Sequence, residues 1–338
     1  MTKVPVAILG GSGYTAAELL KILLRHPGVE IAMITSRQKE SIADLHPFLH
    51  CRLNMDCEPF DPDHLQRRGV AAVFSCLPHG ASSSCIPPLL QRGIRVIDLS
   101  ADYRLRDPVI YEQWYHEPHQ DPHHLAEAVY GLPEIYGERI AQARLVANPG
   151  CYPQTAILGL APLIAAGCIH RTDIIIDSKS GVSGGGRTPK LTFHFPECNE
   201  SVSAYGIGVH RHTPEIEQVL SDVAGQKVEV IFTPHLIPMD RGILSTIYVT
   251  PTRPLEPLEL QELYQRYYQR QPFVRLRSRP PATKDTLHSN FLDIYVQAVR
   301  GGRLIIVTAE DNLVRGASGV AVQNFNRMFG FEETTALL

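Results

Sequence analysis

The stretch Val4-Pro5-Val6-Ala7-Ile8-Leu9-Gly10-Gly11-Ser12-Gly13 joins an apolar run directly to a turn with three glycines. A short apolar run bounded by turn residues predicts a buried strand. A helical pattern and a second apolar run at residues 29–35 follow. The glycine spacing, Gly10-x2-Gly13-x2-Ala16, departs from the commoner G-x-G-x-x-G, but strand, glycine turn, helix and strand in this order predict a dinucleotide-binding unit. The cofactor pyrophosphate would lie at the helix N-terminus. The expected contacts are Gly10, Gly11, Ser12, Gly13, Tyr14 and Thr15.

The residues after the second apolar run predict which dinucleotide binds. An NAD-binding unit usually carries Asp or Glu at this point, where it bonds the ribose 2′-hydroxyl. This chain has Thr35-Ser36-Arg37 instead. Ser36 and Arg37 suit a 2′-phosphate better, because a guanidinium pairs with phosphate and a carboxylate repels it. We therefore predict NADP(H) as the cofactor, and the alternative is that Arg37 is a solvated surface residue.

Two further apolar runs, at residues 70–75 and 94–100, fit the same parallel sheet. Ligands of open α/β sheets gather beyond the carboxyl ends of the strands, where Leu77, Pro78 and Arg104 would lie. Arg104 is thus a candidate partner for an oxyanion. The Pro-, His- and Tyr-rich residues 106–142 are predicted to be a long excursion that is ordered but irregular.

The second half of the chain predicts a different kind of sheet. A strand at residues 173–177 opens into the glycine-rich loop 178–187, where Gly181 and Gly184 indicate close approach to a ligand. Strands near 228–233, 243–249, 291–299 and 303–309, with helices near 214–223 and 255–269, lack regular βα alternation. The predicted fold is α/β, with a Rossmann-type parallel sheet domain plus an α+β catalytic domain carrying a mixed or antiparallel sheet. The expected boundaries are residues 1–150, completed by a C-terminal helix within 311–338, and residues 151–310.

Cys151 is the candidate nucleophile, in the stretch Asn148-Pro149-Gly150-Cys151-Tyr152-Pro153. An apolar strand precedes it and a buried helix is predicted from Thr155, which places Cys151 at a strand-to-helix turn. The amide groups of a helix start favour a thiolate, the form that attacks carbon. The alternative is an inert buried cysteine.

His210-Arg211-His212-Thr213-Pro214-Glu215 supplies the candidate acid/base. Thr213 is a plausible N-cap and Pro214 suits the first helical position, so His212 would lie just before a helix. Imidazole is the group best suited to move protons near neutral pH, and Glu215 could orient it or interact with the helix dipole. In an extended segment only one of His210 and His212 could face the site, and which one remains open.

Composition limits the partners. The formal charge of −3 gives no reason to expect nucleic acid or a membrane surface, so the predicted partner is a small molecule. Seven scattered cysteines, an odd number, indicate a reducing compartment, and the chain start shows no targeting segment, so we expect a cytoplasmic protein. Cys51, Cys57, His46 and His50 do not match a zinc-binding spacing, and no metal is predicted.

Nine segments, in this order along the chain, closely resemble the N-acetyl-γ-glutamyl-phosphate reductase family of the aspartate-semialdehyde dehydrogenase-like superfamily. They are GGSGYT (10–15), LPHG (77–80), DLSADYR (98–104), YGLPE (130–134), NPGCY (148–152), DSKSGVSG (177–184), HRHTPE (210–215), PHLIPMDRG (234–242) and DNLVRGA (311–317). The departures are small: Gly11 and Ala16 stand where the family often has Ala and Gly, and Gln154 stands where Thr often follows Pro.

The resemblance implies an NADPH-dependent reduction of an acyl phosphate in arginine biosynthesis. Cys151 would attack the acyl phosphate to form a thioester, and a histidine of the pair, taken as His212, would be the acid/base, with Glu215 beside it. Asn312, Ser36 and Arg37 are implied cofactor contacts. Arg104, Lys179, Arg211 and Arg241, in or beside the shared segments, are the expected substrate contacts. A homo-oligomer, dimer or tetramer, is also expected.

Three other interpretations compete. Aspartate-semialdehyde dehydrogenase and the carrier-linked aminoadipyl-phosphate reductase use the same chemistry on other acids. A non-catalytic NADP-binding regulator need not retain Cys151, His212 and Arg104 together. A cysteine hydrolase would leave the dinucleotide unit unexplained.

Overall fold

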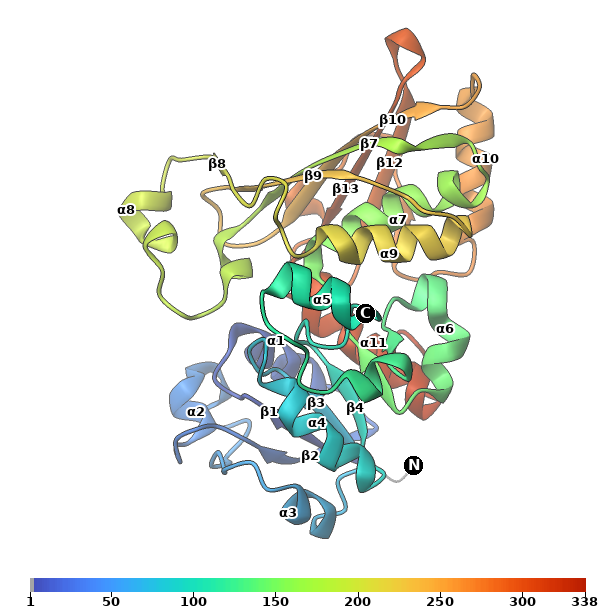
Figure 1. Cartoon of the computed structure of the whole chain (residues 1–338). Helices are drawn as coiled ribbons and strands as arrows, with labels where there is room; N and C mark the ends of the chain where they lie inside the picture. Colours follow the sequence, from blue (N-terminus) through green and yellow to red (C-terminus); the bar gives the residue numbers. More distant parts are fainter. Residues whose placement is uncertain (1–2) are drawn as a thin grey trace. The chain divides into compact units, whose positions relative to one another are not determined.

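The computed structural model describes residues 3–338 (Figure 1). The chain divides into two compact units. The first runs through Pro149 and resumes at Ala317–Leu338, and the second is Gly150–Gly316.

The first unit contains a six-stranded sheet of order β2-β1-β3-β4-β6-β5, in which every pairing is parallel. Its strands are β1 (Val4–Leu9), β2 (Val29–Ile34), β3 (Ala72–Ser75), β4 (Arg95–Asp98), β5 (Val129–Tyr130) and β6 (Leu145–Ala147). All four residues of β3 and the last four of β1 are buried, as expected for parallel strands covered on both faces. The predicted Rossmann-type sheet is confirmed.

Helices surround this sheet. They are α1 (Tyr14–Leu23), α2 (Ile42–Leu45), α3 (Pro62–Arg67), α4 (Ser82–Gln91), α5 (Pro108–Tyr115), α6 (Pro133–Gln142) and α11 (Gly319–Phe329), with 3-10 turns η1 (Pro47–Leu49) and η2 (Pro122–Ala126). The C-terminal α11 packs on α1, α6 and β4, and Asn326 Oδ1 lies 2.8 Å from His26 Nε2. The C-terminal segment thus completes the first unit.

The expectation of an irregular excursion at residues 106–142 was wrong. It contains α5, η2, the edge strand β5 and α6. Asp107 caps α5 by accepting from the Val109 amide at 2.8 Å, and Tyr111 stacks on Tyr115 with ring centroids 4.6 Å apart. These aromatic contacts stabilise a segment whose composition resembles a loop.

The second unit contains a seven-stranded mixed sheet of order β11-β12-β13-β10-β7-β9-β8. Its strands are β7 (Ile169–Ser180), β8 (Ser203–Ala204), β9 (Ile231–Leu236), β10 (Ile243–Pro251), β11 (Val274–Leu276), β12 (Leu292–Ala298) and β13 (Leu304–Glu310). β10 runs antiparallel to β7 and β13, whereas β7 pairs parallel with β9. The predicted mixed sheet is therefore also confirmed.

One face of this sheet is covered by helices. The helices of the second unit are α7 (Cys151–Ala165), α8 (Phe195–Cys198), α9 (Thr213–Ala224) and α10 (Pro257–Tyr268), with short turns η3 (Val182–Gly185), η4 (Leu191–Phe193), η5 (Thr283–Asp285) and η6 (Arg300–Gly302). The π-helical η7 (Val314–Ser318) begins in the second unit and ends in the first. A Cβ atom at Gly159 of α7 would lie 3.0 Å from Thr308 and 3.1 Å from Ile247, so α7 packs directly on β13 and β10. α9 lies beside α7 (Figure 1).

The opposite face of the sheet carries a continuous apolar row. Tyr248 of β10 pairs with Ile175 of β7 and with Ile305 of β13, and Ile175 pairs in turn with Ile231 of β9. Side chains alternate along a strand, so these residues point away from the face that Ile247 presents to α7. Tyr248, Ile175 and Ile305 are half-buried, and Ile231 is 59% exposed.

Candidate active site

Cys151 is the first residue of α7. The helix begins four residues earlier than predicted, directly after the N-cap Gly150. The Gly150 amide donates to Glu215 Oε1 at 2.7 Å, so this amide is bound by a carboxylate and does not face the sulfur. Cys151 is half-buried.

His210 and His212 lie together against the residue that follows Cys151. Their ring centroids are 4.8 Å apart, and each lies 5.9 Å from the Tyr152 ring. The argument that only one of them could face the site applies to an extended segment. The segment is instead a turn and His212 has helical backbone angles, so strand alternation does not separate the two rings. His212, not Thr213, is the N-cap of α9, and Pro214 takes the second helical position.

The two imidazoles differ in their surroundings. Burial and the neighbouring Arg211 guanidinium lower the pKa of His210 to about 4. The Nδ1 atom of His210 accepts from the His212 backbone amide at 3.2 Å. His210 is therefore neutral near pH 7, which favours His212 as the proton carrier.

Two tyrosines near Cys151 were missed by the sequence analysis. Tyr205 donates its hydroxyl to the Tyr152 hydroxyl at 3.1 Å, and Tyr152 donates to the His235 carbonyl at 3.3 Å. Burial raises the pKa of Tyr205 to about 12, with a further contribution from Cys151, so the phenol is neutral. Tyr152 is adjacent to Cys151 in sequence, but Tyr205 is distant and 40% exposed, and no local pattern marks it.

A buried carboxylate beside Cys151 was also missed. A Cβ atom at Gly316 would lie 2.8 Å from Cys151 Cβ and 2.8 Å from Glu310 Oε1. Glu310, the last residue of β13, is fully buried. The segment after β13 thus passes directly against Cys151, and glycine is required there because any side chain would clash.

Asn312 belongs to the same segment after β13, and it forms hydrogen bonds that hold the glycine-rich loop 178–187 in place. Its Oδ1 accepts from the Gly242 amide at 2.8 Å, and its Nδ2 donates to Ser183 Oγ at 3.0 Å. A Cβ atom at Gly181 would lie 2.5 Å from the Asp240 carbonyl oxygen, so this glycine permits close packing of two loops. At Gly184 the nearest atom, Ser180 Oγ, would lie 3.4 Å away, which leaves ordinary contact distance. These contacts give Asn312 and Gly181 a supporting role within the second unit.

The three arginines and one lysine predicted to contact substrate have different environments. Arg241 Nη1 lies 3.3 Å from the buried Asp311 Oδ2, which orients the guanidinium, and Arg211 is exposed. Lys179 pairs with Asp177 at 2.9 Å. It is two positions from Asp177 and opposite Leu244, on the sheet face away from α7, so the strand register argues against a contact with substrate at Cys151.

Arg104 belongs to the first unit, where it is buried. Its Nε donates to the Asn148 carbonyl at 2.8 Å and its Nη2 to the Leu99 carbonyl at 3.1 Å. These bonds fix the segment that leads toward Cys151, which indicates a positioning role more than a contact with an oxyanion.

The glycine turn of the first unit fits a dinucleotide pyrophosphate. Gly10 has a φ of +79°, and a Cβ atom there would lie 2.8 Å from the Cys76 carbonyl oxygen and 3.3 Å from Leu77. Gly13 is the N-cap of α1, with open space around its Cα and no side chain capping the helix amides. Amides left exposed at a helix start bind phosphate, so the turn with Ser12, Tyr14 and Thr15 suits the predicted role.

The residues predicted to select NADP(H) follow β2 directly. Arg37 is exposed, and Ser36 Oγ lies 3.4 Å from Glu40 Oε1. Leu77 and the exposed Pro78 follow β3, at the same edge of the parallel sheet. The predicted cofactor residues of this unit therefore gather at the carboxyl ends of its strands.

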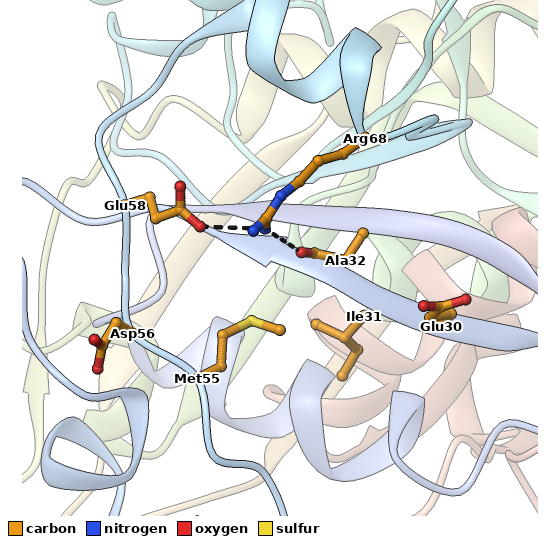
Figure 2. Close-up of a pocket in the computed structure, with 7 residues that line it drawn as sticks. All are labelled: Glu30, Ile31, Ala32, Met55, Asp56, Glu58 and Arg68. Carbon is orange, nitrogen blue, oxygen red and sulfur yellow. Dashed lines mark hydrogen bonds and ion pairs between the residues drawn. The ribbon is translucent and has the colours of Figure 1, made fainter.

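A separate surface pocket of about 500 Å³ lies along β2 in the first unit (Figure 2). It is lined by Glu30, Ile31, Ala32, Met55, Asp56, Glu58 and Arg68. The Arg68 guanidinium is already engaged, since Nη1 donates to the Ala32 carbonyl at 2.7 Å and lies 3.1 Å from Glu58. The pocket contains none of the predicted site residues.

Within residues 3–338, no group of three or more His, Cys, Asp or Glu is arranged to hold a metal ion, and no helix has the length and apolarity needed to cross a membrane.

Comparison with known proteins assigns both units. Residues 5–143 match the semialdehyde dehydrogenase NAD binding domain, and residues 151–312 match the semialdehyde dehydrogenase dimerisation domain. Aspartate semialdehyde dehydrogenase II of Vibrio cholerae, solved in complex with ASA, has a TM-score of 0.74 at 15% identity over 98% of this chain and 99% of its own. The enzyme of Candida albicans, solved with NADP, has a TM-score of 0.74 at 11% identity over 97% and 99%. The fold and the two domain matches thus define a two-domain protein of the semialdehyde dehydrogenase class.

Relatives of higher identity narrow the assignment. N-acetyl-gamma-glutamyl-phosphate reductase of Moorella thermoacetica is 50% identical over 99% of this chain and 98% of its own length. The protein of the same name from Rhodopirellula baltica is 48% identical over 98% of both. The chain belongs to the N-acetyl-γ-glutamyl-phosphate reductase family, which confirms the resemblance drawn from its motifs.

Proposed function

We propose that this chain catalyses the NADPH-dependent reduction of N-acetyl-L-glutamyl 5-phosphate to N-acetyl-L-glutamate 5-semialdehyde and phosphate, a step of arginine biosynthesis. The observation that carries the proposal is full-length identity near 50% to reductases of that name, in a chain whose histidine pair lies against Tyr152, the residue after Cys151. The related acyl-phosphate reductases are not favoured, because the aspartate semialdehyde dehydrogenases match at 11–16% identity.

The proposed mechanism uses Cys151 as nucleophile. Its thiolate attacks the acyl carbon, the carbon–oxygen bond to phosphate breaks, and phosphate leaves with the bonding electrons. NADPH, when bound, supplies the hydride that reduces the thioester. His212 is the acid/base: it protonates the substrate oxygen as the thioester is reduced, and it removes that proton as the carbon–sulfur bond breaks and the Cys151 thiolate is released. Neutral Tyr152 and Tyr205 line this site without competing for the proton.

The proposed NADP(H) contacts are the turn from Gly10 to Thr15 for the pyrophosphate and Ser36 with Arg37 for the 2′-phosphate. Leu77, Pro78 and Gly184 are proposed as further contacts, with Gly181 and Asn312 shaping the loop that carries Gly184. Among the basic residues, Arg241 is proposed as the principal substrate contact, because Asp311 orients it. Arg211 is a second candidate, and Arg104 is proposed to act through the Asn148 segment.

The Arg37→Asp variant is expected to bind NADPH at least tenfold more weakly, while NADH binding changes little. The reason is the loss of a charged hydrogen bond of about 1.5–3 kcal/mol to the 2′-phosphate and its replacement by a repulsive charge. Fluorescence titration of both cofactors measures this difference. Arg25→Asp, an identical charge change at an exposed residue just after the C-terminal end of α1, serves as control. Equal affinity of the unmodified protein for NADPH and NADH would overturn the assignment.

We also propose a homo-oligomer, a dimer or tetramer, assembled through the second unit. The support is the match to a dimerisation domain together with the apolar row of Ile175, Tyr248, Ile305 and Ile231 on the sheet face away from α7. Partly exposed apolar side chains in a continuous row are typical of association surfaces. Light scattering should report a multiple of 37.6 kDa, and a stable monomer at micromolar concentration would contradict the proposal.

The proposed compartment is the cytoplasm, since none of the seven cysteines of the described chain forms a disulfide. Fractionation of the source cells tests this directly.

The catalytic proposal is tested in a coupled assay, in which a kinase phosphorylates the side chain of N-acetylglutamate to supply the substrate. NADPH oxidation and phosphate release are then followed, and the two should occur in equal amounts. Absence of substrate-dependent oxidation would contradict it.

A further inference from the structure

The start of α7 lacks the groups that usually satisfy a helix N-terminus. In a capping box, the side chain of the N-cap binds the N3 amide, and a carboxylate or amide side chain at N3 accepts from the N-cap amide. Here the N-cap is Gly150, which has no side chain, and the N3 residue is Pro153. The helix that begins with Cys151 can therefore make neither bond from its own residues.

Glu215 makes one of these bonds from another helix. It is the N3 residue of α9, and its Oε1 accepts from the Gly150 amide at 2.7 Å. The carboxylate is 1% exposed, which strengthens a charge-assisted bond relative to one in water. α7 and α9 lie side by side, so this bond links their two starting points (Figure 1).

The start of α9 is satisfied in a complementary way. Its N-cap amide, that of His212, would be the normal partner of Glu215 in a capping box. That amide instead donates to His210 Nδ1 at 3.2 Å, and His210 can accept because it is neutral. The Glu215 carboxylate, which would normally cap α9, thus caps α7, and His210 Nδ1 takes its place as the acceptor at the start of α9.

We propose that Glu215 and His210 are positioning residues that hold the backbones of Cys151 and His212 in fixed positions relative to each other. Glu215 does so by capping α7 and His210 by capping α9 in its place. Glu215 fixes the residue before the nucleophile, and His210 fixes the amide of the proton carrier. The inference assigns Glu215 a role through Gly150, in addition to its expected position beside His212. It rests on the proposed function for its kinetic consequence, but the contacts themselves can be tested without turnover.

Three substitutions of Glu215 separate positioning from charge. Glu215→Gln keeps an acceptor of the same length, Glu215→Ala removes it, and Glu215→Asp keeps the charge but shortens the reach by one methylene. We expect Ala and Asp to lower kcat about 10- to 100-fold, since small displacements of catalytic groups have effects of this size, and Gln to remain within about threefold. The Kd for NADPH should change less than about twofold in all three, because the glycine turn belongs to the first unit.

Glu217 provides a matched control on the same helix. Its Oε1 accepts from the Val230 amide at 3.0 Å, another backbone bond made across the fold, but at a site without catalytic residues. Glu217→Ala should lose that bond and keep kcat. A general loss of stability of α9 would lower the activity of both alanine variants, whereas positioning lowers only that of Glu215→Ala.

Hydrogen–deuterium exchange of the peptide covering residues 148–154 tests the contact independently of the reaction. Exchange should rise in Glu215→Ala and Glu215→Asp, remain close to wild type in Glu215→Gln, and be unchanged in Glu217→Ala. If turnover is absent in the unmodified protein, the proposed function fails while this pattern still tests the contact. Exchange that does not rise in Glu215→Ala, a kcat for Gln as low as for Ala, or an undiminished kcat in Ala despite faster exchange would each overturn the inference.

Discussion

Cys151→Ser is expected to abolish turnover while NADP(H) binding persists. A serine hydroxyl is far less acidic than a thiol, so no thiolate-grade nucleophile forms at the start of α7. Binding persists because the glycine turn of Gly10 to Gly13 lies in the other unit of the chain. Steady-state assays of NADPH oxidation, combined with titration of NADPH fluorescence, measure both properties.

Cys198→Ser is the matched control for this variant. Cys198 is a partly exposed cysteine at the end of α8, in the same unit as Cys151. It should keep its activity. A Cys151→Ser protein that retains about a tenth or more of the wild-type rate would remove Cys151 from the nucleophile role.

His212→Asn is expected to lower turnover by about 10²–10⁴-fold, the usual cost of losing a general acid/base, with little change in cofactor affinity. His212 is preferred because the pKa of His210 is lowered to about 4, so that His210 carries no proton to donate near pH 7. Near neutral pH, the dependence of the rate on pH should therefore have the same shape in the wild type and in His210→Asn.

His210→Asn tests the assignment from the other side. Asparagine keeps an acceptor near the place of Nδ1, so the bond from the His212 amide can survive and the loss should be much milder. His210→Leu, which removes the acceptor, should be the more damaging of the two. A larger loss for His210→Asn than for His212→Asn would transfer the proton-carrying role to His210.

Much of the fold could be predicted because its signals are local. The apolar run ending at Leu9 and the glycine turn after it define the first β-strand and the start of α1 over a few residues, and the structure follows them. The mixed sheet was predictable from strand density in the same way. Helices α5 and α6 were not, because contacts with distant parts of the chain stabilise sequences rich in Pro, His and Tyr. The His79 ring lies 4.4 Å from that of Tyr115 in α5, and α6 packs on α11.

The site was predictable only in part, for a related reason. Cys151, His212 and Glu215 lie in short motifs, so their neighbourhood could be anticipated. The arrangement of the histidine pair depends on Gly206 and Gly208, whose φ angles of +58° and +71° turn the chain and bring both rings to Tyr152. The strand pairing of β13 brings Glu310 to Gly316, which also lies against Cys151, and no local pattern reveals this arrangement.

The exchange of caps between α7 and α9 could not be predicted either. The sequence shows a glycine before Cys151 and a glutamate three residues into α9, and each is ordinary by itself. Only the structure shows that Glu215 Oε1 lies 2.7 Å from the Gly150 amide, so that the glutamate caps a helix other than its own.

The central claim is tested most directly by the reverse reaction. Reduction of NADP+ is followed with N-acetylglutamate 5-semialdehyde or aspartate semialdehyde, each with and without inorganic phosphate. The account predicts phosphate-dependent NADPH formation with N-acetylglutamate 5-semialdehyde, and a much lower kcat/KM with aspartate semialdehyde. An equal or greater kcat/KM with aspartate semialdehyde, or a rate independent of phosphate, would contradict it.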